Sequence, residues 1–379
     1  MTLTILAAYA PGLGHANTVL PLVEDFTRHG DCAVFLCGSQ TVARQADTHL
    51  LPVHHRRAGP ESFLRTSDNG LSGDEVITRM GRASRHDITT LIHELRPDLL
   101  VCDTSERGAV LAALDCAVPF VRVVSCADAA TGPGSVEEAR RRALIRGREH
   151  DDLESPLNLG TIAFGPPWYF HDTHPGEPLS CYRYRPPPTP APVSGPVRPR
   201  ALVSFGTFVA EPSPPIFEQI IEGLIDAGLR SVTLKIRHRP ARDQIQRYAA
   251  TAAARTGCEI TTAAELNLRQ HLGSADMLLC HGSATSTLEA LYHQVIPIIA
   301  PTHGDTYFVA RQCAATSTAV VIDWANGCTR NAIRQAAMTA IQGPAVRAGV
   351  ERFDIDNNRL PPGSELVEKL YGQLTAQPG

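Results

Sequence analysis

Histidine, serine and threonine side chains gather in one short stretch of the sequence. The apolar run Met277–Cys280 leads into it, leucines at helical spacing follow it, and a second apolar run, Val295–Ala300, comes next. This order predicts a strand, a turn, a helix and a strand, which together form a βαβ unit. The turn offers polar groups from His281, Gly282, Ser283, Thr285 and Ser286.

Such a turn is suited to binding an anion, because free backbone N–H groups and the positive end of the helix dipole meet there. Gly282 lets the backbone approach a phosphate closely. The simpler interpretation is an ordinary turn with Ser286 as the helix N-cap. Two carboxylates favour the functional interpretation: Glu289, one helical turn further on, and Asp305, after the next strand. We expect both to point at one crevice, where sugar hydroxyls need hydrogen-bond acceptors.

A histidine and an aspartate follow strands in the first half of the chain. His15 closes a glycine-rich turn that contains Gly12 and Gly14, and Asp103 follows the expected buried strand Asp98–Cys102. Because the strand ends of an open α/β sheet gather around one crevice, the two side chains are expected to meet. The aspartate would then make the imidazole a better general base. A local turn histidine and a helix N-cap at position 103 are the alternatives without function.

Composition limits the number of domains and the class of protein. The chain has 379 residues, enough for two domains, and its 43% hydrophobic and 20% charged content is that of a soluble globular protein. A net charge of −4 argues against nucleic-acid binding. The ten cysteines show no Cys-x-x-Cys pair or zinc spacing, so we expect reduced thiols, no metal and a cytoplasmic protein. Neither a signal peptide nor an apolar run of roughly 20 residues is present, so no membrane insertion is expected.

Strands and helices alternate through both halves of the sequence. This predicts two α/β domains, each with a doubly wound parallel sheet. We expect a first domain over residues 1–185 whose last strand is Leu159–Phe164, and a proline-rich linker over 186–199. The second domain covers 200–360 and opens with a strand that ends in the turn Gly206-Thr207, where the threonine can donate to a phosphate. Residues 361–379 should form a helix that packs back on the first domain.

Two further segments have weaker patterns. Residues 48–87 read as loops with short helical pieces, and residues 135–155 read as an exposed, highly charged helix. Loops of this kind commonly shape a substrate pocket in two-domain enzymes.

Taken together, these motifs resemble the family 1 glycosyltransferases of the GT-B fold, and above all the bacterial enzymes that glycosylate natural products. The resemblance covers nearly the whole chain and implies two Rossmann-like domains that face each other across a cleft. Gly12, Gly14 and His15 match a first-domain motif whose histidine deprotonates the acceptor hydroxyl in the family. Asp103 matches the aspartate that supports this histidine.

The second half of the chain matches the part of the family that binds the donor. Gly206 and Thr207 match a turn that contacts phosphate, and the stretch His281–Glu289 matches the family signature. The resemblance implies a diphosphate site, a ribose contact and a contact to the donor sugar. The diphosphate would be held by His281, Thr285 and Ser286, the ribose by Glu289, and the sugar by Asp305 and Thr306.

Three positions depart from the family pattern. Ser283 replaces a glycine, Thr306 replaces a glutamine, and the stretch that normally carries a base-stacking tryptophan has none, with Glu265 near its place. The choice between a UDP and a dTDP donor therefore stays open.

The resemblance implies an inverting, metal-independent transfer of a sugar from a nucleoside-diphosphate sugar to a hydroxyl or amine of a small-molecule natural product. No cofactor, nucleic acid or membrane is expected to take part, and a homodimer is left open. A sugar-nucleotide 2-epimerase and a catalytically silent sugar-nucleotide-binding partner of another transferase are the alternatives. The acceptor is not identified by the sequence.

Overall fold

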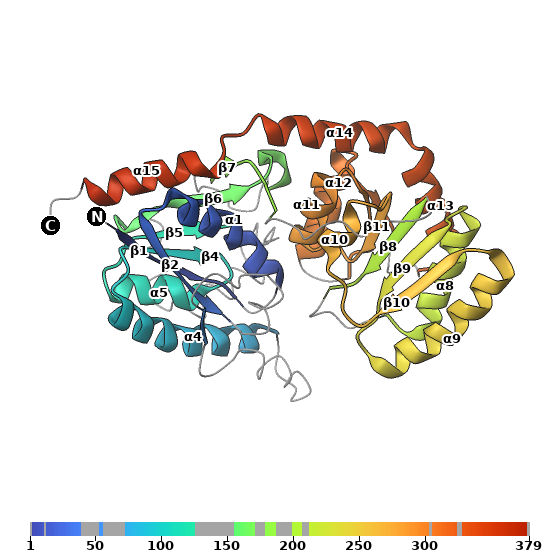
Figure 1. Cartoon of the computed structure of the whole chain (residues 1–379), viewed down its shortest axis with the longest axis horizontal. Helices are drawn as coiled ribbons and strands as arrows, with labels where there is room; N and C mark the ends of the chain where they lie inside the picture. Colours follow the sequence, from blue (N-terminus) through green and yellow to red (C-terminus); the bar gives the residue numbers. More distant parts are fainter. Residues whose placement is uncertain are drawn as a thin grey trace. The chain divides into compact units, whose positions relative to one another are not determined.

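The computed structural model divides the chain into two compact units, each with one parallel sheet (Figure 1). Unit 1 comprises Met1–Pro187 and Leu360–Gly379, and unit 2 comprises Pro188–Arg359. The residues that the structure describes are 2–10, 13–38, 53–55, 73–125, 155–170, 179–186, 199–206, 212–302, 305–323 and 328–376.

The described part of unit 1 contains a seven-stranded sheet in the order β3-β2-β1-β4-β5-β6-β7, with every neighbouring pair parallel. The strands are β1 (Leu3–Ala8), β2 (Cys32–Gly38), β3 (Val53–His55), β4 (Leu99–Asp103), β5 (Phe120–Val123), β6 (Asn158–Phe164) and β7 (Leu179–Tyr182). Burial on both faces explains why β1 and β4 are nearly continuous apolar runs.

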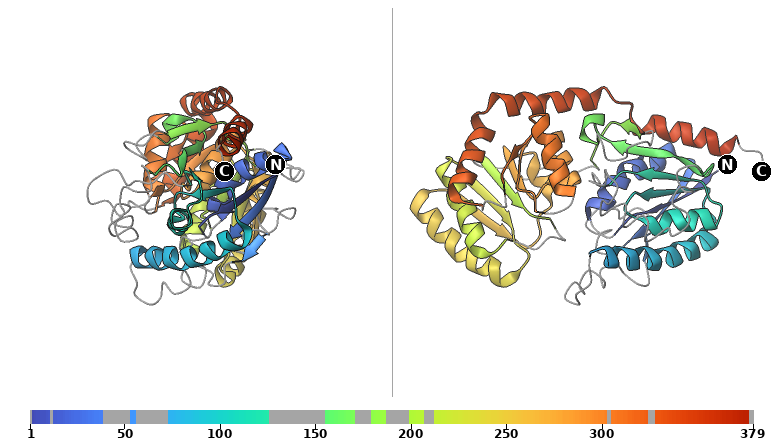
Figure 2. Two further views of the ribbon diagram at one scale, coloured as in Figure 1. Left: turned by 90° about the vertical axis from the view of Figure 1, so that its left-hand side faces the viewer. Right: turned by 180° about the vertical axis from the view of Figure 1, so that it is seen from behind.

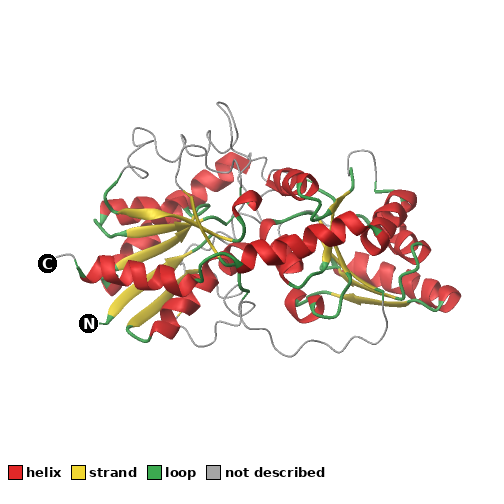
Figure 3. Ribbon diagram, turned by 90° about the horizontal axis from the view of Figure 1, so that it is seen from above, coloured by secondary structure: helices red, strands yellow, loops and turns green. Residues whose placement is uncertain are grey.

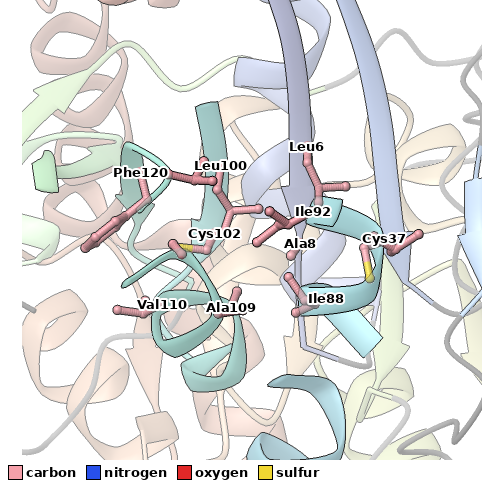
Figure 4. Packing of buried hydrophobic residues seen from close by; sticks show 14 residues of the cluster. Leu6, Ala8, Cys37, Ile88, Ile92, Leu100, Cys102, Ala109, Val110 and Phe120 are labelled. Atoms are coloured by element: carbon pink, nitrogen blue, oxygen red, sulfur yellow. The ribbon is translucent and has the colours of Figure 1, made fainter. Parts of the chain in front are cut away.

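Helices cover both faces of this sheet (Figure 1, Figure 2). One face carries α4 (Gly73–Leu95) and α5 (Arg107–Asp115), which pack against each other, and the other carries α1 (Leu13–His29) and α15 (Gly363–Thr375). Between α4, α5 and the strands lies a buried apolar cluster (Figure 4). Its members include Leu6, Ala8, Ile88, Ile92, Leu100, Cys102, Ala109, Val110 and Phe120.

The helix α15 belongs to unit 1 although the chain reaches it only after unit 2. The backbone N–H of Arg183 donates to the carbonyl oxygen of Pro361 at 2.9 Å, and its guanidinium donates to that of Leu360 at 3.2 Å. Further along, the rings of His29 and Tyr371 lie 4.6 Å apart. These contacts join the C-terminal helix to α1 and to the end of β7.

Unit 2 repeats the arrangement of unit 1, with strands between two layers of helices (Figure 3). Its described strands form a parallel sheet in the order β10-β9-β8-β11-β12-β13, the same order relative to the chain as the first six strands of unit 1. They are β8 (Arg200–Ser204), β9 (Ser231–Lys235), β10 (Glu259–Ala263), β11 (Met277–Cys280), β12 (Ile296–Ile299) and β13 (Val320–Val321). Such a sheet binds ligands at the carboxyl ends of its strands.

The helices of unit 2 divide between the two faces of its sheet (Figure 1). On one face, α8 packs against both α9 and α13. On the other, α11 contacts α10, α12 and α14. The bounds are α8 (Pro214–Asp226), α9 (Arg239–Thr256), α10 (Leu268–Leu272), α11 (Ala284–Tyr292), α12 (Asp305–Ala315), α13 (Arg330–Gln342) and α14 (Pro344–Asn358).

The predicted fold class, two doubly wound parallel sheets, is confirmed, but several elements differ from the sequence prediction. Leu159–Phe164 is not the last strand of the first domain, because β7 adds a short strand at the edge of the sheet. The helix α4 begins at Gly73 and is continuous to Leu95, although residues 48–87 were predicted as loops with short helical pieces. The helix α14 was not predicted; Pro344 occupies its first turn, where proline favours a helix rather than breaking it. Residues 135–154 of the charged helix predicted over 135–155 lie outside the described residues.

The packing of α8 against α13 depends on a missing side chain, and this generates a stability prediction. A Cβ atom at Gly223 would lie 2.6 Å from the carbonyl oxygen of Arg330 and 2.7 Å from Cβ of Ile333. Because backbone must move to admit a methyl group, Gly223→Ala should lower the free energy of unfolding by about 1–3 kcal/mol. Guanidinium chloride denaturation of the full chain measures it.

Gly372→Ala is the matched control, since a Cβ atom on this α15 residue would meet nothing within 4 Å. There the higher helix propensity of alanine should add about 0.5–1 kcal/mol. Equal effects of the two substitutions would contradict the packing described for α8 and α13.

Candidate functional site

The carboxylate of Asp103 lies where three strands of unit 1 end. This residue is the last of β4 and is completely buried. Its Oδ2 atom accepts the backbone N–H of Ala10 at 2.7 Å, and its Oδ1 atom accepts the N–H of Ser105 at 2.6 Å and the hydroxyl of Ser125 at 2.8 Å. Ala10 follows β1 and Ser125 follows β5, so the carboxyl ends of three neighbouring strands converge on one carboxylate.

The imidazole of His15 contacts the same carboxylate. His15 lies in the first turn of α1, and its Nδ1 atom is 3.3 Å from Oδ2 of Asp103. A carboxylate only accepts, so when the ring is neutral this contact favours the tautomer with the proton on Nδ1 and a lone pair on Nε2. The His15 side chain is 28% exposed, while that of Asp103 is not exposed at all. The structure therefore brings together the two residues that the sequence suggested as a catalytic pair.

Charge and hydrogen bonding keep Asp103 ionised. Burial alone raises the pKa of this carboxyl, but the charge of His15 and the hydrogen bonds from His15, Ala10 and Ser125 outweigh it, so its pKa lies below the ordinary value of 3.8. The N-cap of α5 is Glu106 rather than Asp103. The interpretation of Asp103 as a helix cap is therefore wrong.

In unit 2, two glycines shape the turns beside His281. Gly206 follows β8 with φ +77°, and a Cβ atom there would lie 2.7 Å from Cε1 of His281. Gly282 has φ +89°, and its Cβ atom would lie 2.6 Å from Cγ2 of Ile299 on β12. Both positions combine a left-handed backbone with a close contact, which glycine alone satisfies. The end of β8 is therefore packed against the buried His281, and the end of β12 is packed against the next residue, Gly282.

The helix α11 begins at this turn. Its N-cap is Ser283, so the prediction of Ser286 as the N-cap is wrong. Thr285 is buried and Ser286 is half-buried. The backbone N–H groups of the first helical turn have no acceptor within the helix, and they carry the positive end of its dipole. The arrangement has the chemistry of an anion-binding turn.

Glu289, further along α11, forms a buried ion pair. Nε of Arg269, on α10, donates to its Oε1 atom at 2.9 Å, with the side chains 11% and 4% exposed respectively. Burial raises the pKa of Glu289, and the charge and hydrogen bond of Arg269 oppose this shift. The sequence pointed to Glu289 but not to Arg269, which holds it in place.

The beginning of α12 lies beside the turn at Gly282. Asp305, the first residue of α12, is half-buried, and Thr306 is 1% exposed. The hydroxyl oxygen of Thr306 accepts the N–H of Thr302 at 3.2 Å, and its carbonyl oxygen lies 3.4 Å from where a Cβ atom of Gly282 would be. The Thr306 hydroxyl therefore makes a hydrogen bond to the loop that leads into α12.

Some predicted site residues lie elsewhere or outside the described part. Gly12 and Thr207 are outside the described residues, and the carbonyl oxygen of Gly14 accepts the hydroxyl of Thr18 at 2.9 Å. The contributions of Ser125 and Arg269 were not predicted, because neither belongs to a motif. In the described ranges, no group of three or more His, Cys, Asp or Glu side chains is arranged to hold a metal ion. Those ranges also contain no helix that combines the length and apolar character of a membrane span.

Solved structures share this architecture along the whole chain. The glycosyltransferase SnogD from Streptomyces nogalater is 17% identical, with a TM-score of 0.69 and coverage of 99% of this chain and 100% of SnogD. SsfS6, a Streptomyces sp. SF2575 glycosyltransferase complexed with thymidine diphosphate, is 17% identical, with a TM-score of 0.69 and coverage of 97% and 99%. The spinosyn forosaminyltransferase SpnP is 16% identical, with a TM-score of 0.74 and coverage of 99% and 100%.

At these identities the likeness shows the fold, which is GT-B, with two Rossmann-like domains. The fold expected from the His281–Glu289 signature and the His15 motif is confirmed. No protein-family model matches the chain, and no curated protein matches it in sequence.

The ion pair of Arg269 and Glu289 generates a prediction about pH. Arg269→Met leaves the buried carboxylate without its cation, which should lower the free energy of unfolding by about 3–5 kcal/mol at neutral pH. Burial then acts alone and raises the pKa of Glu289 further above its ordinary value of 4.5. A carboxyl whose pKa is higher in the folded state loses stability as the pH rises through that pKa. The wild-type carboxyl also titrates above 4.5, so the deficit should grow as the pH rises from the wild-type pKa of Glu289 to the higher pKa of the variant, measured by denaturation at a series of pH values.

The double variant Arg269→Met/Glu289→Gln is the control, because it removes the titrating group. It should lose the added pH dependence. An Arg269→Met deficit that is the same at every pH would show that the arginine acts by packing rather than by charge.

Proposed function

We propose that the protein is a glycosyltransferase that moves a sugar from a nucleoside-diphosphate sugar to a hydroxyl or amine of a small molecule. The contact between Nδ1 of the partly exposed His15 ring and the buried Asp103, at the carboxyl end of the first sheet, is the observation that carries this proposal. A histidine oriented by an ionised aspartate is a general base, and the GT-B fold supplies a second domain for the donor. The contact also argues against a catalytically silent partner.

In this mechanism, His15 takes the proton of the acceptor as the acceptor oxygen or nitrogen attacks the anomeric carbon. Attack on the face opposite the leaving group inverts that carbon. Asp103 holds Nδ1–H of the ring, so that Nε2 is the basic atom. The positive charge that develops on the imidazole is stabilised by the buried carboxylate, which stays ionised because its pKa is low.

The diphosphate leaves toward the turn at Gly282. Backbone N–H groups at the beginning of α11, together with His281, Thr285, Ser286 and the predicted contact of Thr207, stabilise its charge. No metal or cofactor is assigned a part. Glu289 contacts the ribose, and Asp305 and Thr306 contact the sugar. Transfer requires that the two units act on one donor and exclude water from it.

The proposed donor is a dTDP- or UDP-sugar, and the proposed acceptor is a natural product made by a bacterium. Thymidine diphosphate bound to the structurally similar SsfS6 supports a pyrimidine nucleotide. A cytoplasmic location fits both substrates. Incubating the pure protein with a panel of dTDP- and UDP-sugars tests the proposal, because slow release of nucleoside diphosphate without an acceptor is expected of a transferase. An epimerised donor as product would instead identify a 2-epimerase.

The role of His15 is tested by substitution. His15→Ala should reduce sugar transfer by about 10²- to 10⁴-fold, the usual contribution of a general base, while the Kd for the nucleoside diphosphate stays within about twofold. Product formation by mass spectrometry and binding by calorimetry measure the two effects. The control is His93→Ala, at an exposed position on α4 of the same unit. Full activity of His15→Ala would reject the assignment.

The role of the turn at Gly206 is tested by a matched pair of glycines. Gly206→Ala forces a side chain into a left-handed backbone and against His281, whereas Gly228→Ala meets the same backbone condition, with φ +89°, in open space. Each should cost about 1–2 kcal/mol of stability from the backbone. Only Gly206→Ala should weaken pyrophosphate binding, by about tenfold or more, because displacing one charge-assisted donor removes that much affinity. Equal binding by both variants would place the anion elsewhere.

A further inference from the structure

The hydroxyl of Ser125 is a second side chain, besides that of His15, that contacts the Asp103 carboxylate. It donates to Oδ1 at 2.8 Å, while Nδ1 of His15 lies 3.3 Å from Oδ2. Two further donors to this carboxylate are the backbone N–H groups of Ala10 and Ser105, which almost any residue could supply. The contact from Ser125 therefore depends on the type of residue in the same way as the contact from His15.

Backbone hydrogen bonds fix the position of this hydroxyl. Ser125 comes two residues after β5, which lies between β4 and β6 in the sheet, and it is 6% exposed. The N–H of Val124 donates to the carbonyl oxygen of Ile162 on β6 at 2.9 Å, and the N–H of Ser125 donates to the hydroxyl oxygen of Thr104 at 3.3 Å. The chain after β5 is thus held on both sides, with the serine hydroxyl directed at the carboxylate.

The direction of the hydrogen bonds around Ser125 follows from the number of protons. A carboxylate only accepts, so the single hydroxyl proton of Ser125 goes to Asp103. The hydroxyl oxygens of Ser105 and Ser125 lie 3.1 Å apart. Because Ser125 has no second hydroxyl proton, Ser105 is the donor in this contact. Hydrogen bonds in such a chain polarise one another, so Ser105 strengthens the bond that Ser125 makes to the carboxylate.

The two oxygen atoms of the Asp103 carboxylate share one negative charge. A donor at Oδ1 draws charge toward that atom and leaves Oδ2 a weaker acceptor for the ring N–H of His15. Burial raises the pKa of Asp103, but the charge of His15 and the hydrogen bonds to the carboxylate, that of Ser125 among them, lower it below its ordinary value. Ser125 and His15 therefore stabilise the same anion from opposite oxygens.

We propose that Ser125 is a positioning residue that sets the pH at which His15 takes up its proton, an inference that rests, for its effect on sugar transfer, on the function proposed above. Its bond to Asp103 limits how strongly the carboxylate stabilises the protonated ring. More of the imidazole is then neutral near neutral pH and able to act as a general base. Without this hydroxyl, Oδ2 becomes a stronger acceptor and His15 keeps its proton to higher pH.

Other charged groups lie near the same strand end. Glu106 and Arg107 begin α5, Arg122 lies on β5, and the side chains of all three are buried. Their charges act on the thiol of Cys102, the residue before Asp103. A substitution at Ser125 leaves these groups in place, so their effect is common to the wild-type protein and the variants.

NMR titration of the His15 ring in the full chain tests the proposal without any substrate. Histidine labelled at ring carbon Cε1, assigned with His15→Ala, reports the midpoint of the titration. In Ser125→Ala the midpoint should rise by about 0.5–1 pH unit, a part of the roughly 1–3 units that a neighbouring opposite charge contributes. Sugar transfer should then fall about 3- to 10-fold on the acid side of its pH profile and stay within about twofold above both midpoints.

Ser125→Thr is the matched control, because it keeps the hydroxyl and should keep the wild-type midpoint. Ser105→Ala keeps the backbone bond to Asp103 and loses the bond to Ser125, so it should raise the midpoint by a smaller amount. Since Ser105 is half-buried, this variant keeps the test valid if Ser125→Ala does not fold, which thermal denaturation shows.

The results that would overturn the proposal are distinct from those that would overturn the proposed function. An unchanged or lower midpoint in folded Ser125→Ala would reject the role of the serine. An equal loss of transfer at every pH, without a change in the midpoint, would show that Ser125 supports the fold only. A raised midpoint in a protein that transfers no sugar would instead support the effect of Ser125 on His15 and reject the glycosyltransferase proposal.

Discussion

The burial of the Asp103 carboxylate is the constraint on which the first unit depends. An ion without solvent must be compensated by the protein, and here the compensation comes from the N–H of Ala10, the N–H of Ser105 and the hydroxyl of Ser125, together with His15. Those groups follow three different strands and begin α1. Because a carboxylate collects them at one point, the strand ends stay aligned and the imidazole has one orientation. The same bonds lower the pKa of Asp103, so the feature that organises the fold also maintains the charge that a general base needs.

The second unit has the same strand order, but the groups at the carboxyl ends of its strands are suited to an anion rather than to a proton. Where β4 ends in a carboxylate, β11 ends in a turn that presents an imidazole and the amino end of a helix. Close packing replaces ion pairing as the positioning force: Gly206 lets one turn lie against His281, and Gly282 lets the next lie against Ile299. One carboxyl edge is thus suited to accept a proton and the other to hold an anion. The two edges differ in the residues that follow the strands and not in the order of the strands.

Much of this could be predicted because it follows from periodicity and from the rule that parallel strands end at one edge. That rule is why His15 and Asp103 could be expected to meet, and why the stretch after Cys280 could be read as a helix-terminal turn. Contacts between separate loops were not predictable. The pairing of Arg269 with Glu289 and of Gly206 with His281 depends on side-chain rotamers and backbone angles that no local pattern encodes. The short edge strand β7 and the helix α14 were not predicted for another reason. The proline-rich segment near β7 and the Gly-Pro pair at the start of α14 are patterns that usually mark the end of a helix or strand.

The position of the proton on the neutral His15 ring tests the central claim most directly. Nitrogen-15 NMR of the ring, in protein labelled at histidine and assigned with His15→Ala, reports which nitrogen carries the proton at a pH where the ring is neutral. The arrangement beside Asp103 predicts a proton on Nδ1 and a lone pair on Nε2, with this preference weakened in Asp103→Asn. A proton on Nε2 in the wild-type protein would leave no basic atom facing the acceptor and would contradict the account.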